Sequence, residues 1–372
     1  MKFTLDWLKD HLETNATADA IGEALTTIGL EVESIEDQGR ALKPFVVAYV
    51  AEAKDHANSD HLKVCKVDAG TGTLIDVVCG APNARTGMKS VFAFPGTWIP
   101  GKDFELKPNV MIRGAPSNGM LFSAMELQLG NDHDGIIELP DDAPVGKSYV
   151  DYAGIGGVVF DISLTPNRGD AASVRGVARD LAAYGIGTLK DGTIVPVPSP
   201  GGKSPIAVEL RFSKDEPQAC RMFAGRLIRG VRNGPSPRWL QDRLRAIGLR
   251  PISALVDITN FVTYDRGRPL HVFDADKLTS PVHARMAKPG ETILALDGKT
   301  YTLDPSIPVI ADATGAVGIA GIMGGEPTGS TDATTNVFVE SAWFEPMVVA
   351  QAGRKLGISS DARYRFERTV DP

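Results

Sequence analysis

The stretch HLKVCKVDAGTGTLIDVVCGA, residues 61–81, decides the fold predicted for the first half of the chain. Apolar and polar residues alternate in two short runs bounded by glycines, which is typical of β-strands joined by turns. Runs of the same kind recur on either side: FVVAYVAEA (45–53), SVFAFPGTWI (90–99) and GMLFSAMELQL (119–129). Several short strands at this spacing predict a small β-barrel or sandwich across residues 41–149.

The segments that flank this β-rich region predict a small α/β domain. Thr4 and Thr17 are each followed by apolar residues at helical spacing, so each is predicted to cap a short helix. Asp170 is predicted to cap a third helix that ends before a glycine. We therefore expect residues 1–40 and 150–195 to form one discontinuous domain, with the barrel inserted between its halves.

The remainder of the chain predicts a larger α/β domain. The stretch GTIVPVPSPGGKSP, residues 192–205, is rich in proline, glycine and serine and is typical of a linker. Beyond it, helices are predicted to begin at Pro237 and near Pro346, among runs of strand-like sequence. We expect residues 205–372 to form this domain, so the predicted fold class is multi-domain with α/β and all-β parts.

Charge and composition narrow the classes of protein without identifying one. The formal net charge of −7 argues against a protein that wraps nucleic acid without specificity, but it allows RNA binding through one local patch. No run of about 18 apolar residues occurs, so no membrane-spanning helix is predicted. A secretory signal is not evident, and three cysteines give no disulfide framework, so we expect a cytoplasmic protein.

Two motifs have both a structural and a ligand-binding interpretation. His56, His61, Cys65 and Cys79 suggest zinc, but they include no CxxC pair, so core cysteines beside a polar turn are favoured and no metal site is predicted. The cluster GIAGIMGGE, residues 318–326, lacks the lysine of a phosphate loop. It fits either a turn that requires positive φ or close approach of the backbone to a ligand. A serine hydrolase is unsupported because no GxSxG motif occurs.

Glu340 and His271 are candidates for one shared site. Glu340 interrupts the apolar run NVFVESAWF, residues 336–344, so a strand there is expected to point its carboxyl toward a pocket. Buried acids are rare unless paired, and an acid in a pocket is a functional candidate. The structural alternatives are a hydrogen-bonded core histidine for His271 and an ion pair with an arginine such as Arg250 for Glu340.

A set of motifs resembles one protein family over essentially the whole chain. HANSDHLKVCKVDAG (56–70) resembles a tRNA-binding domain with an oligonucleotide-binding (OB) fold, and a similar domain occurs in the methionyl enzyme and in free-standing tRNA-binding proteins. More specific motifs follow in the second half: LTPNRGDAASVRGVARDLAA (164–183), VDITNFVTYDRGRPLHVFDADKL (256–278), GIMGGE (321–326), ESAWFEP (340–346) and GISSDARYRFERTVDP (357–372). In order and spacing they are similar to the β subunit of bacterial phenylalanyl-tRNA synthetase.

The resemblance implies an OB-fold barrel that binds tRNA and an editing domain that hydrolyses tyrosine wrongly attached to tRNA(Phe). Seven residues match editing-pocket positions: Asn260, His271, Gly321, Gly324, Glu340, Ser360 and Ala362. Ser360 stands where many relatives have threonine, and it keeps the hydroxyl. Glu340 is expected to accept a hydrogen bond from the tyrosine hydroxyl, because an apolar pocket alone separates tyrosine from phenylalanine only modestly. His271 is expected either to act as a base or to orient the attacking water or the terminal ribose.

The resemblance also implies partners and cofactors. Candidate tRNA contacts in the barrel are basic: Lys54, Lys63, Lys66 and Arg113. We expect an α2β2 heterotetramer with the synthetase α subunit, with ATP and Mg²⁺ used by the complete enzyme and no cofactor held by these residues. The family's β subunit continues past residue 372, so this chain is expected to be a fragment that does not aminoacylate by itself. The alternatives are a tRNA-binding or assembly module without activity in isolation, and a small-molecule-binding protein that uses a pocket near Glu340.

Overall fold

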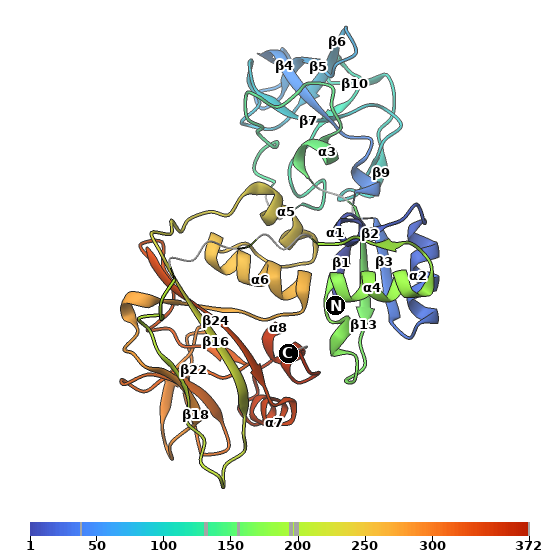
Figure 1. Cartoon of the computed structure of the whole chain (residues 1–372). Helices are drawn as coiled ribbons and strands as arrows, with labels where there is room; N and C mark the ends of the chain where they lie inside the picture. Colours follow the sequence, from blue (N-terminus) through green and yellow to red (C-terminus); the bar gives the residue numbers. More distant parts are fainter. Residues whose placement is uncertain (38, 130–132, 155–156, 193–195, 197–200, 371–372) are drawn as a thin grey trace. The chain divides into compact units, whose positions relative to one another are not determined.

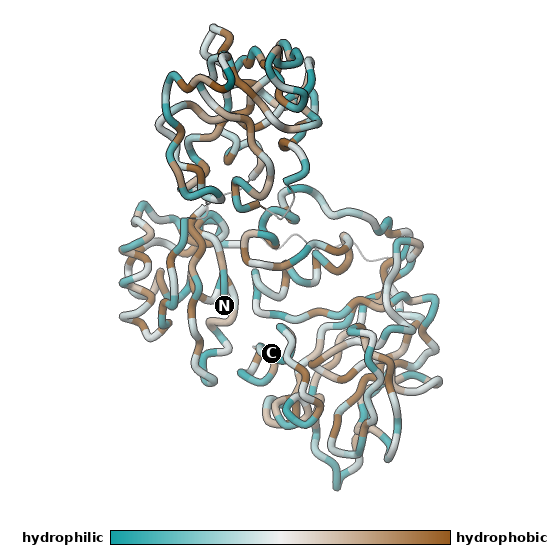
Figure 2. The backbone as a smooth tube through the Cα atoms, turned by 180° about the vertical axis from the view of Figure 1, so that it is seen from behind, coloured by the Kyte–Doolittle hydropathy of each residue, from teal (hydrophilic) through white to brown (hydrophobic). Residues whose placement is uncertain are grey.

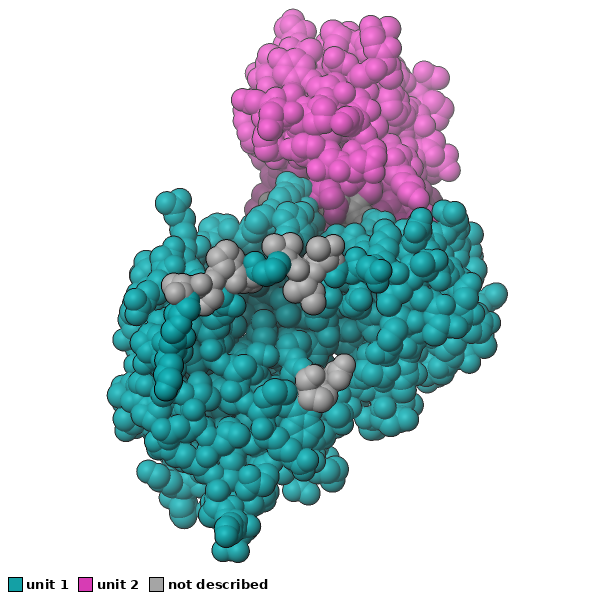
Figure 3. All heavy atoms as spheres, viewed as in Figure 1, with its two compact units in different colours: residues 1–35, 159–372 teal, residues 36–158 magenta. Residues whose placement is uncertain are grey.

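The computed structural model describes residues 1–37, 39–129, 133–154, 157–192, 196 and 201–370. The chain forms two compact units: unit 1 contains residues 1–35 and 159–372, and unit 2 contains residues 36–158 (Figure 3). Half of the predicted linker, residues 193–195 and 197–200, lies outside the described residues. Among the residues described, no helix has the length and apolar character needed to span a bilayer.

Unit 2 is built on an antiparallel sheet. Its strands lie in the order β12-β7-β4-β5-β6, with bounds β4 (Val46–Asp55), β5 (Lys63–Asp68), β6 (Leu74–Cys79), β7 (Lys89–Ala93) and β12 (Met120–Leu121). The Asn118 N–H donates to the Asp76 carbonyl at 2.8 Å, and the Val78 N–H donates to Ser117 Oγ at 3.1 Å. These bonds join the segment before β12 to β6, so the sheet is nearly closed. The predicted series of short strands is confirmed.

Shorter elements complete unit 2: η1 (Arg40–Leu42), β8 (Trp98–Ile99), β9 (Phe104–Glu105), β10 (Val110–Ile112), β11 (Ala115–Ser117) and α3 (Tyr149–Ala153). Figure 2 shows hydrophobic and hydrophilic stretches alternating along the backbone of both units. Cys65 and Cys79 are buried on the adjacent strands β5 and β6. Burial raises the pKa of both thiols, that of Cys65 to about 12. They are therefore unreactive thiols of the barrel core.

In unit 1, segments from both sides of the barrel pair in one sheet. Its strand order is β1-β13-β3, with bounds β1 (Lys2–Thr4), β13 (Val158–Ser163) and β3 (Glu31–Asp37). Phe3 lies opposite Phe160, and their rings stack with centroids 5.2 Å apart. Next to this sheet are α1 (Leu5–His11), α2 (Ala18–Thr27) and α4 (Val174–Tyr184), with a short ladder of β2 (Leu12–Glu13) and β14 (Thr188–Leu189) (Figure 1).

Thr4 and Thr17 cap the first two helices, as predicted. Thr4 Oγ1 accepts a hydrogen bond from the Trp7 N–H at 3.1 Å, and Thr17 Oγ1 accepts one from the Ala20 N–H at 3.3 Å. Each bond satisfies one of the backbone donors that a helix leaves free at its N-terminus. The short helices therefore begin where the local sequence places them.

The prediction that Asp170 caps α4 is wrong. The cap is Ser173, whose Oγ accepts a hydrogen bond from the Gly176 N–H at 2.9 Å. Asp170 lies earlier, in the 3₁₀ turn η2 (Gly169–Ala171), and its carboxylate pairs with Arg168 and Arg179. Two arginines engage this carboxylate, so a later side chain caps the helix.

Residues 201–370 form two larger sheets. One has the order β15-β18-β21-β22-β23, with bounds β15 (Val208–Leu210), β18 (Val282–Met286), β21 (Pro308–Ala311), β22 (Ala316–Ile319) and β23 (Met323–Gly324). The other has the order β16-β24-β17, with bounds β16 (Cys220–Arg229), β24 (Asn336–Phe344) and β17 (His271–Asp274). Minor elements are η3 (Ala275–Lys277), β19 (Thr292–Leu294) and β20 (Thr300–Thr302).

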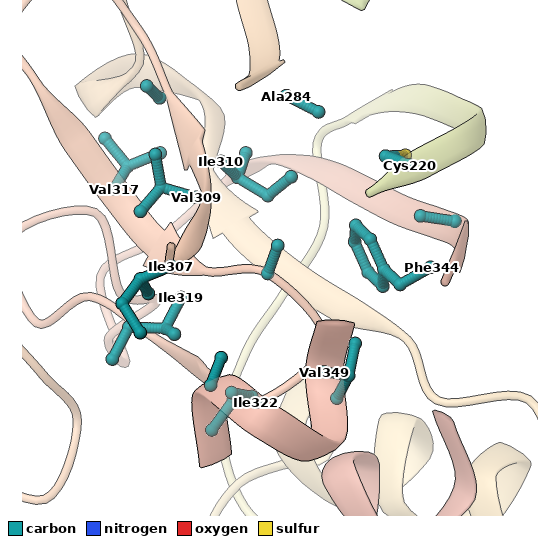
Figure 4. Packing of buried hydrophobic residues seen from close by; sticks show 14 of the residues in the cluster. Cys220, Ala284, Ile307, Val309, Ile310, Val317, Ile319, Ile322, Phe344 and Val349 are labelled. Carbon is teal, nitrogen blue, oxygen red and sulfur yellow. The ribbon is translucent and has the colours of Figure 1, made fainter. Parts of the chain in front are cut away.

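Four helices accompany these sheets: α5 (Arg238–Ala246), α6 (Ala254–Arg266), α7 (Pro346–Leu356) and α8 (Asp361–Phe366). The predicted starts of α5 and α7 are confirmed, whereas α6 and α8 were not predicted. Figure 4 shows the shared core, in which Phe344 of β24 and Val349 of α7 lie with Ile319 and Ile322 of the glycine-rich segment. This core packs strands of both sheets against α7 and α8, the helices at the C-terminal end of the chain.

Helix α6 is anchored to α1 by buried polar and aromatic contacts. The Trp7 indole N–H donates to Asp265 Oδ1 at 2.8 Å, and His11 Nε2 lies 2.6 Å from the same oxygen. The rings of Trp7 and Phe261 stack with centroids 5.1 Å apart. Because one carboxylate oxygen serves two partners on α1, the end of α6 has a fixed position in unit 1.

The fold therefore contains the predicted combination of a barrel-like β region and mixed α/β structure. Its division into compact units places residues 1–35 together with 159–372. The domain boundaries drawn from the sequence within unit 1 remain a prediction.

Candidate functional site

One cavity of unit 1 collects the residues singled out from the sequence. Its volume is about 360 Å³, and it is lined by parts of α6, β17, β22, β23, β24 and α8. All seven predicted pocket positions line it: Asn260, His271, Gly321, Gly324, Glu340, Ser360 and Ala362. Most of its remaining wall is apolar, with contributions from Phe273, Leu296, Ile310, Ile319, Met323 and Phe366. A small set of polar groups in an apolar cavity is the usual composition of a small-molecule site.

His271 and Glu340 are direct neighbours across two strands. β17 is antiparallel to β24, and His271 lies opposite Glu340 in the register. Residues opposite each other in an antiparallel pair point to the same face of the sheet. The His271 ring meets the Phe273 ring edge-on, with centroids 4.3 Å apart. The strand pairing therefore presents one imidazole and one carboxyl side by side to the cavity.

Both groups are neutral near pH 7 because of burial. Glu340 is 7% exposed, and burial raises the pKa of its carboxyl to about 8. Burial lowers the pKa of His271 to about 4. His271 is partly exposed as a residue, but its Nε2 atom is enclosed and has no hydrogen-bond partner within the described structure. The site is therefore a neutral acid beside a neutral imidazole with an unused polar atom.

The structure does not support the ion-pair alternative for Glu340. No ion pair joins Glu340 to a cation within the part of the chain described, and the Arg250 side chain is exposed. A buried carboxyl without a cationic partner keeps its proton, since the charged form is poorly solvated there. The carboxyl is thus available to a ligand rather than committed to the fold.

The glycines of the cluster make room for the site. A Cβ on Gly324 would lie 2.2 Å from His271 Cε1, so only glycine lets this strand approach the imidazole. Gly321 has φ +70, and a Cβ there would lie 2.9 Å from Phe344. Its N–H makes no hydrogen bond among the residues described. Gly321 has the positive φ that the turn interpretation of the cluster requires, and Gly324 allows close approach to the His271 ring. Close approach of this backbone to a ligand remains a prediction.

Ser360 lines the cavity, but its hydroxyl is engaged by the backbone. Ser360 Oγ donates to the Ile322 carbonyl at 2.7 Å and accepts the Arg363 N–H at 3.1 Å, so it caps α8 and ties this helix to the glycine-rich segment. A threonine hydroxyl at this position could make the same two bonds.

Asp361 and Tyr264 support the site, and sequence reasoning missed them. The Tyr264 hydroxyl donates to Asp361 Oδ1 at 2.7 Å, which connects α6 to α8 across the cavity wall. Arg365 is 1% exposed, lies 4.3 Å from the Tyr264 ring centroid and donates to the Ala172 carbonyl. Both residues lie within motifs quoted above, but nothing in the local sequence indicates that they pair. Their hydrogen bond depends on how the fold brings α6 and α8 together.

The four basic barrel residues suggested for tRNA contact differ in whether a carboxylate pairs with their charge. Lys54 pairs with Glu52 at 2.6 Å, and Lys66 pairs with Asp76 at 2.7 Å. Lys63 Nζ donates to the Ala84 carbonyl at 2.8 Å, and Arg113 donates to the Asn58 carbonyl at 3.3 Å. Two of the four positive charges are therefore offset by a carboxylate, and their role in RNA binding remains a prediction.

Comparison with protein families assigns a class to each part. Residues 45–148 match the model described as a putative tRNA binding domain, and residues 219–372 match the B3/4 domain. The first match covers the barrel-like sheet, and the second covers the cavity. The chain thus combines a tRNA-binding domain with a B3/4 domain.

Two closely similar curated relatives belong to one protein family. The chain is 59% identical over its whole length to the phenylalanine–tRNA ligase β subunit of Bradyrhizobium diazoefficiens, and it covers 46% of that protein. It is 57% identical over its whole length to the same subunit of Rhodopseudomonas palustris, again covering 46% of it. The chain therefore belongs to the family of phenylalanine–tRNA ligase β subunits. It spans about half the length of the curated relatives that it matches.

One solved structure is also similar in part. It is an N-terminal fragment of the phenylalanyl-tRNA synthetase β subunit from Pyrococcus horikoshii, with 20% identity and a TM-score of 0.30. The match covers 54% of this chain and 62% of that one.

Proposed function

We propose that the cavity of unit 1 hydrolyses tyrosine esters of tRNA(Phe), and that the tRNA-binding domain contributes to holding this substrate. The observation that carries the proposal is the cross-strand pair of His271 and Glu340, neutral and side by side in an apolar cavity. The cavity volume of about 360 Å³ falls in the range of small-molecule sites. Membership of the β-subunit family supports an aminoacyl-tRNA as the substrate.

Glu340 would select tyrosine over phenylalanine. A protonated carboxyl has an oxygen that accepts the phenol proton and an O–H that donates to the phenol oxygen. Phenylalanine satisfies neither, which leaves a buried acid without its partners at a cost of about 1–3 kcal/mol. Selection by a missing hydrogen bond is stronger than selection by shape when two ligands differ by one hydroxyl.

His271 would position the attacking water rather than remove its proton. A base that holds a proton only below about pH 4 is poorly matched to proton abstraction at pH 7. A neutral imidazole nitrogen still accepts a hydrogen bond from water. The water oxygen then attacks the ester carbonyl carbon, the bond to the ribose oxygen breaks, and the proton that the water loses ends on that ribose oxygen. The unused Gly321 N–H is a candidate donor to the developing oxyanion.

The decisive experiment is deacylation of Tyr-tRNA(Phe) by the 372-residue chain, with Phe-tRNA(Phe) as the comparison. We expect the tyrosyl ester to be hydrolysed faster than the phenylalanyl ester and faster than in buffer. If both esters decay at the buffer rate while tRNA still binds, the chain is a tRNA-binding or assembly module in isolation.

Ligation of phenylalanine is proposed only for the whole enzyme. The relatives are named as ligase β subunits, which supports an α-subunit partner. The α2β2 assembly and the use of ATP and Mg²⁺ by the complete enzyme remain proposals. Among the described residues of this chain, no three His, Cys, Asp or Glu side chains converge as metal ligands. The donor set present here does not fit a Mg²⁺ site, so no step of ester hydrolysis is assigned to a metal.

A further inference from the structure

A basic segment lies beside the helix that lines the cavity. Residues 229–250 contain six arginines and one acidic residue, Asp242, in a chain whose formal net charge is −7. The segment runs from the end of β16 through α5 to the residues before α6. Its arginines are Arg229, Arg232, Arg238, Arg243, Arg245 and Arg250. Clustered arginine in an acidic protein indicates a local function rather than general solubility.

Half of these arginines have a structural role. Arg243 pairs with Asp10 at 2.5 Å, and its guanidinium lies 5.5 Å from the Trp239 ring centroid and 5.8 Å from that of Trp7. Arg238 and Arg245 share Asp242, at 3.3 Å and 3.1 Å. Arg243 thus holds α5 against α1, and Arg238 and Arg245 form ion pairs within α5, which explains three of the six charges.

Arg229, Arg232 and Arg250 have no such explanation. All three are exposed, and no carboxylate lies within ion-pair distance of any of them in the part of the chain described. The backbone holds two of them near the start of α6: the Ala254 N–H donates to the Gly234 carbonyl at 2.7 Å, two residues after Arg232. Arg250 precedes the same helix in the chain. The unpaired charges thus belong to one region.

An exposed indole accompanies these charges. Trp239 is 54% exposed and meets Phe261 edge-on, with ring centroids 5.6 Å apart. Phe261 follows Asn260, which lines the cavity, so Trp239 packs on the same helix that forms the cavity wall. An exposed aromatic ring on the same segment as unpaired arginines is a common surface for single-stranded nucleic acid, which offers bases to stack and phosphates to neutralise.

We propose that Trp239, Arg232 and Arg250 bind the single-stranded 3′ end of a tRNA whose terminal aminoacyl group occupies the cavity. This inference rests on the proposed function, because it requires an aminoacyl-tRNA substrate. Charge complementarity favours RNA over a protein partner here. The exposed Ile252 and Ile258 make docking of another polypeptide the competing outcome.

The test uses the 372-residue chain and compares two variants with a matched control. The variants are Arg232→Gln with Arg250→Gln, and Trp239→Leu; the control is Arg354→Gln, an exposed arginine of α7 outside this region. Each is checked for an unchanged circular dichroism spectrum and melting temperature. Binding of uncharged tRNA(Phe) is measured between about 50 and 200 mM salt, and deacylation of Tyr-tRNA(Phe) is measured as KM and kcat.

The double arginine variant should raise KM, leave kcat unchanged and flatten the slope of log K against log salt by about 1.4, which is two single-strand phosphate contacts. Trp239→Leu should weaken tRNA binding roughly five- to a hundredfold without changing that slope. The control should match the wild type. An unchanged slope and KM in the double variant, with wild-type deacylation intact, overturns this inference and leaves the proposed function standing.

Two other outcomes are distinguishable. If the wild type binds tRNA but does not deacylate it, while the double variant still flattens the salt slope, the proposed function fails and the RNA-binding surface stands. If the variants keep the wild-type slope and KM but lose association with a purified synthetase α subunit, the surface docks protein and the inference is wrong.

Discussion

The burial of Glu340 makes the stability of the folded chain depend on pH. It lies in the central strand of a three-stranded sheet, with Gly225 on one side and His271 on the other. Since no cation compensates for the lost water, the native state keeps the carboxyl proton up to about pH 8. The unfolded chain releases it near the ordinary value of 4.5. Between these values the native state binds more protons than the unfolded state, so stability falls as the pH rises.

Glu340→Gln should therefore stabilise the protein increasingly as the pH rises from 5 to 8. Glutamine imitates the neutral acid in shape and polarity, and it has no proton to lose on unfolding. The measurement is the melting temperature of both proteins at pH 5, 6, 7 and 8. A difference that does not change with pH would show that Glu340 is ionised in the native state.

Glu340→Ala should lose the preference for tyrosine. With both hydrogen bonds to the phenol removed, Tyr-tRNA(Phe) hydrolysis should slow by about ten- to a hundredfold, towards the Phe-tRNA(Phe) rate. Deacylation of both esters is measured side by side, with the melting temperature as the check on folding. An equal effect on both esters would assign Glu340 a structural role only.

The rate of deacylation should show no step near pH 6.5, the ordinary pKa of a histidine side chain. With the pKa of His271 lowered to about 4, the neutral imidazole persists through pH 5 to 7, and the rate should show no loss of a base in that window. A fall centred near the ordinary value of 6.5 would show a histidine acting as the base. His271→Ala should slow hydrolysis more than it weakens tRNA binding; an unchanged rate would remove it from the mechanism.

At the scale of elements, the site depends on how closely β23 approaches β17. Gly324 faces Gly318 across the β22–β23 ladder, which makes the two glycines a matched pair. A Cβ on Gly324 meets the His271 ring at 2.2 Å, whereas a Cβ on Gly318 has no neighbour nearer than 3.7 Å. The two glycines differ because the His271 imidazole lies beside Gly324 and not beside Gly318.

Gly324→Ala should abolish or strongly reduce deacylation, since the imidazole must move or the strands must separate. Gly318→Ala should have little effect on the same rate, because its contacts are at ordinary van der Waals distance. Both variants are assayed with Tyr-tRNA(Phe) and compared by melting temperature. Equal activity in the two would mean that the position of His271 does not matter for the reaction.

At the scale of the whole molecule, tRNA binding must rely on local charge. The chain has a formal net charge of −7, so its overall field repels a polyanion. Affinity for tRNA(Phe) should therefore be weak and should fall steeply between about 50 and 200 mM salt. Lys54→Ala and Lys66→Ala should change it less than Lys63→Ala and Arg113→Ala, because the first two charges are offset by Glu52 and Asp76. Filter-binding titrations at several salt concentrations test both statements.

Local sequence was sufficient for features that act over a few residues. The caps at Thr4 and Thr17, the helix starts at Pro237 and Pro346, and the alternation in residues 61–81 all depend on neighbours within about one helical turn or one strand. The resemblance to a known family also supplied seven predicted pocket positions, all of which line the cavity. The wrong assignment of Asp170 shows the limit of this reasoning, since two acceptors close in sequence competed for one helix end.

Tertiary structure alone decided how these residues behave together. The protonation of Glu340 and His271 follows from burial by strands and helices distant in sequence, and no local pattern contains that information. The pairing of Tyr264 with Asp361 and the distinction between engaged and free arginines likewise depend on which segments the fold brings together. The sequence by itself determined which side chains and short elements are present. Desolvation and packing, which sum over the whole unit, determined their charge, their partners and their availability to a ligand.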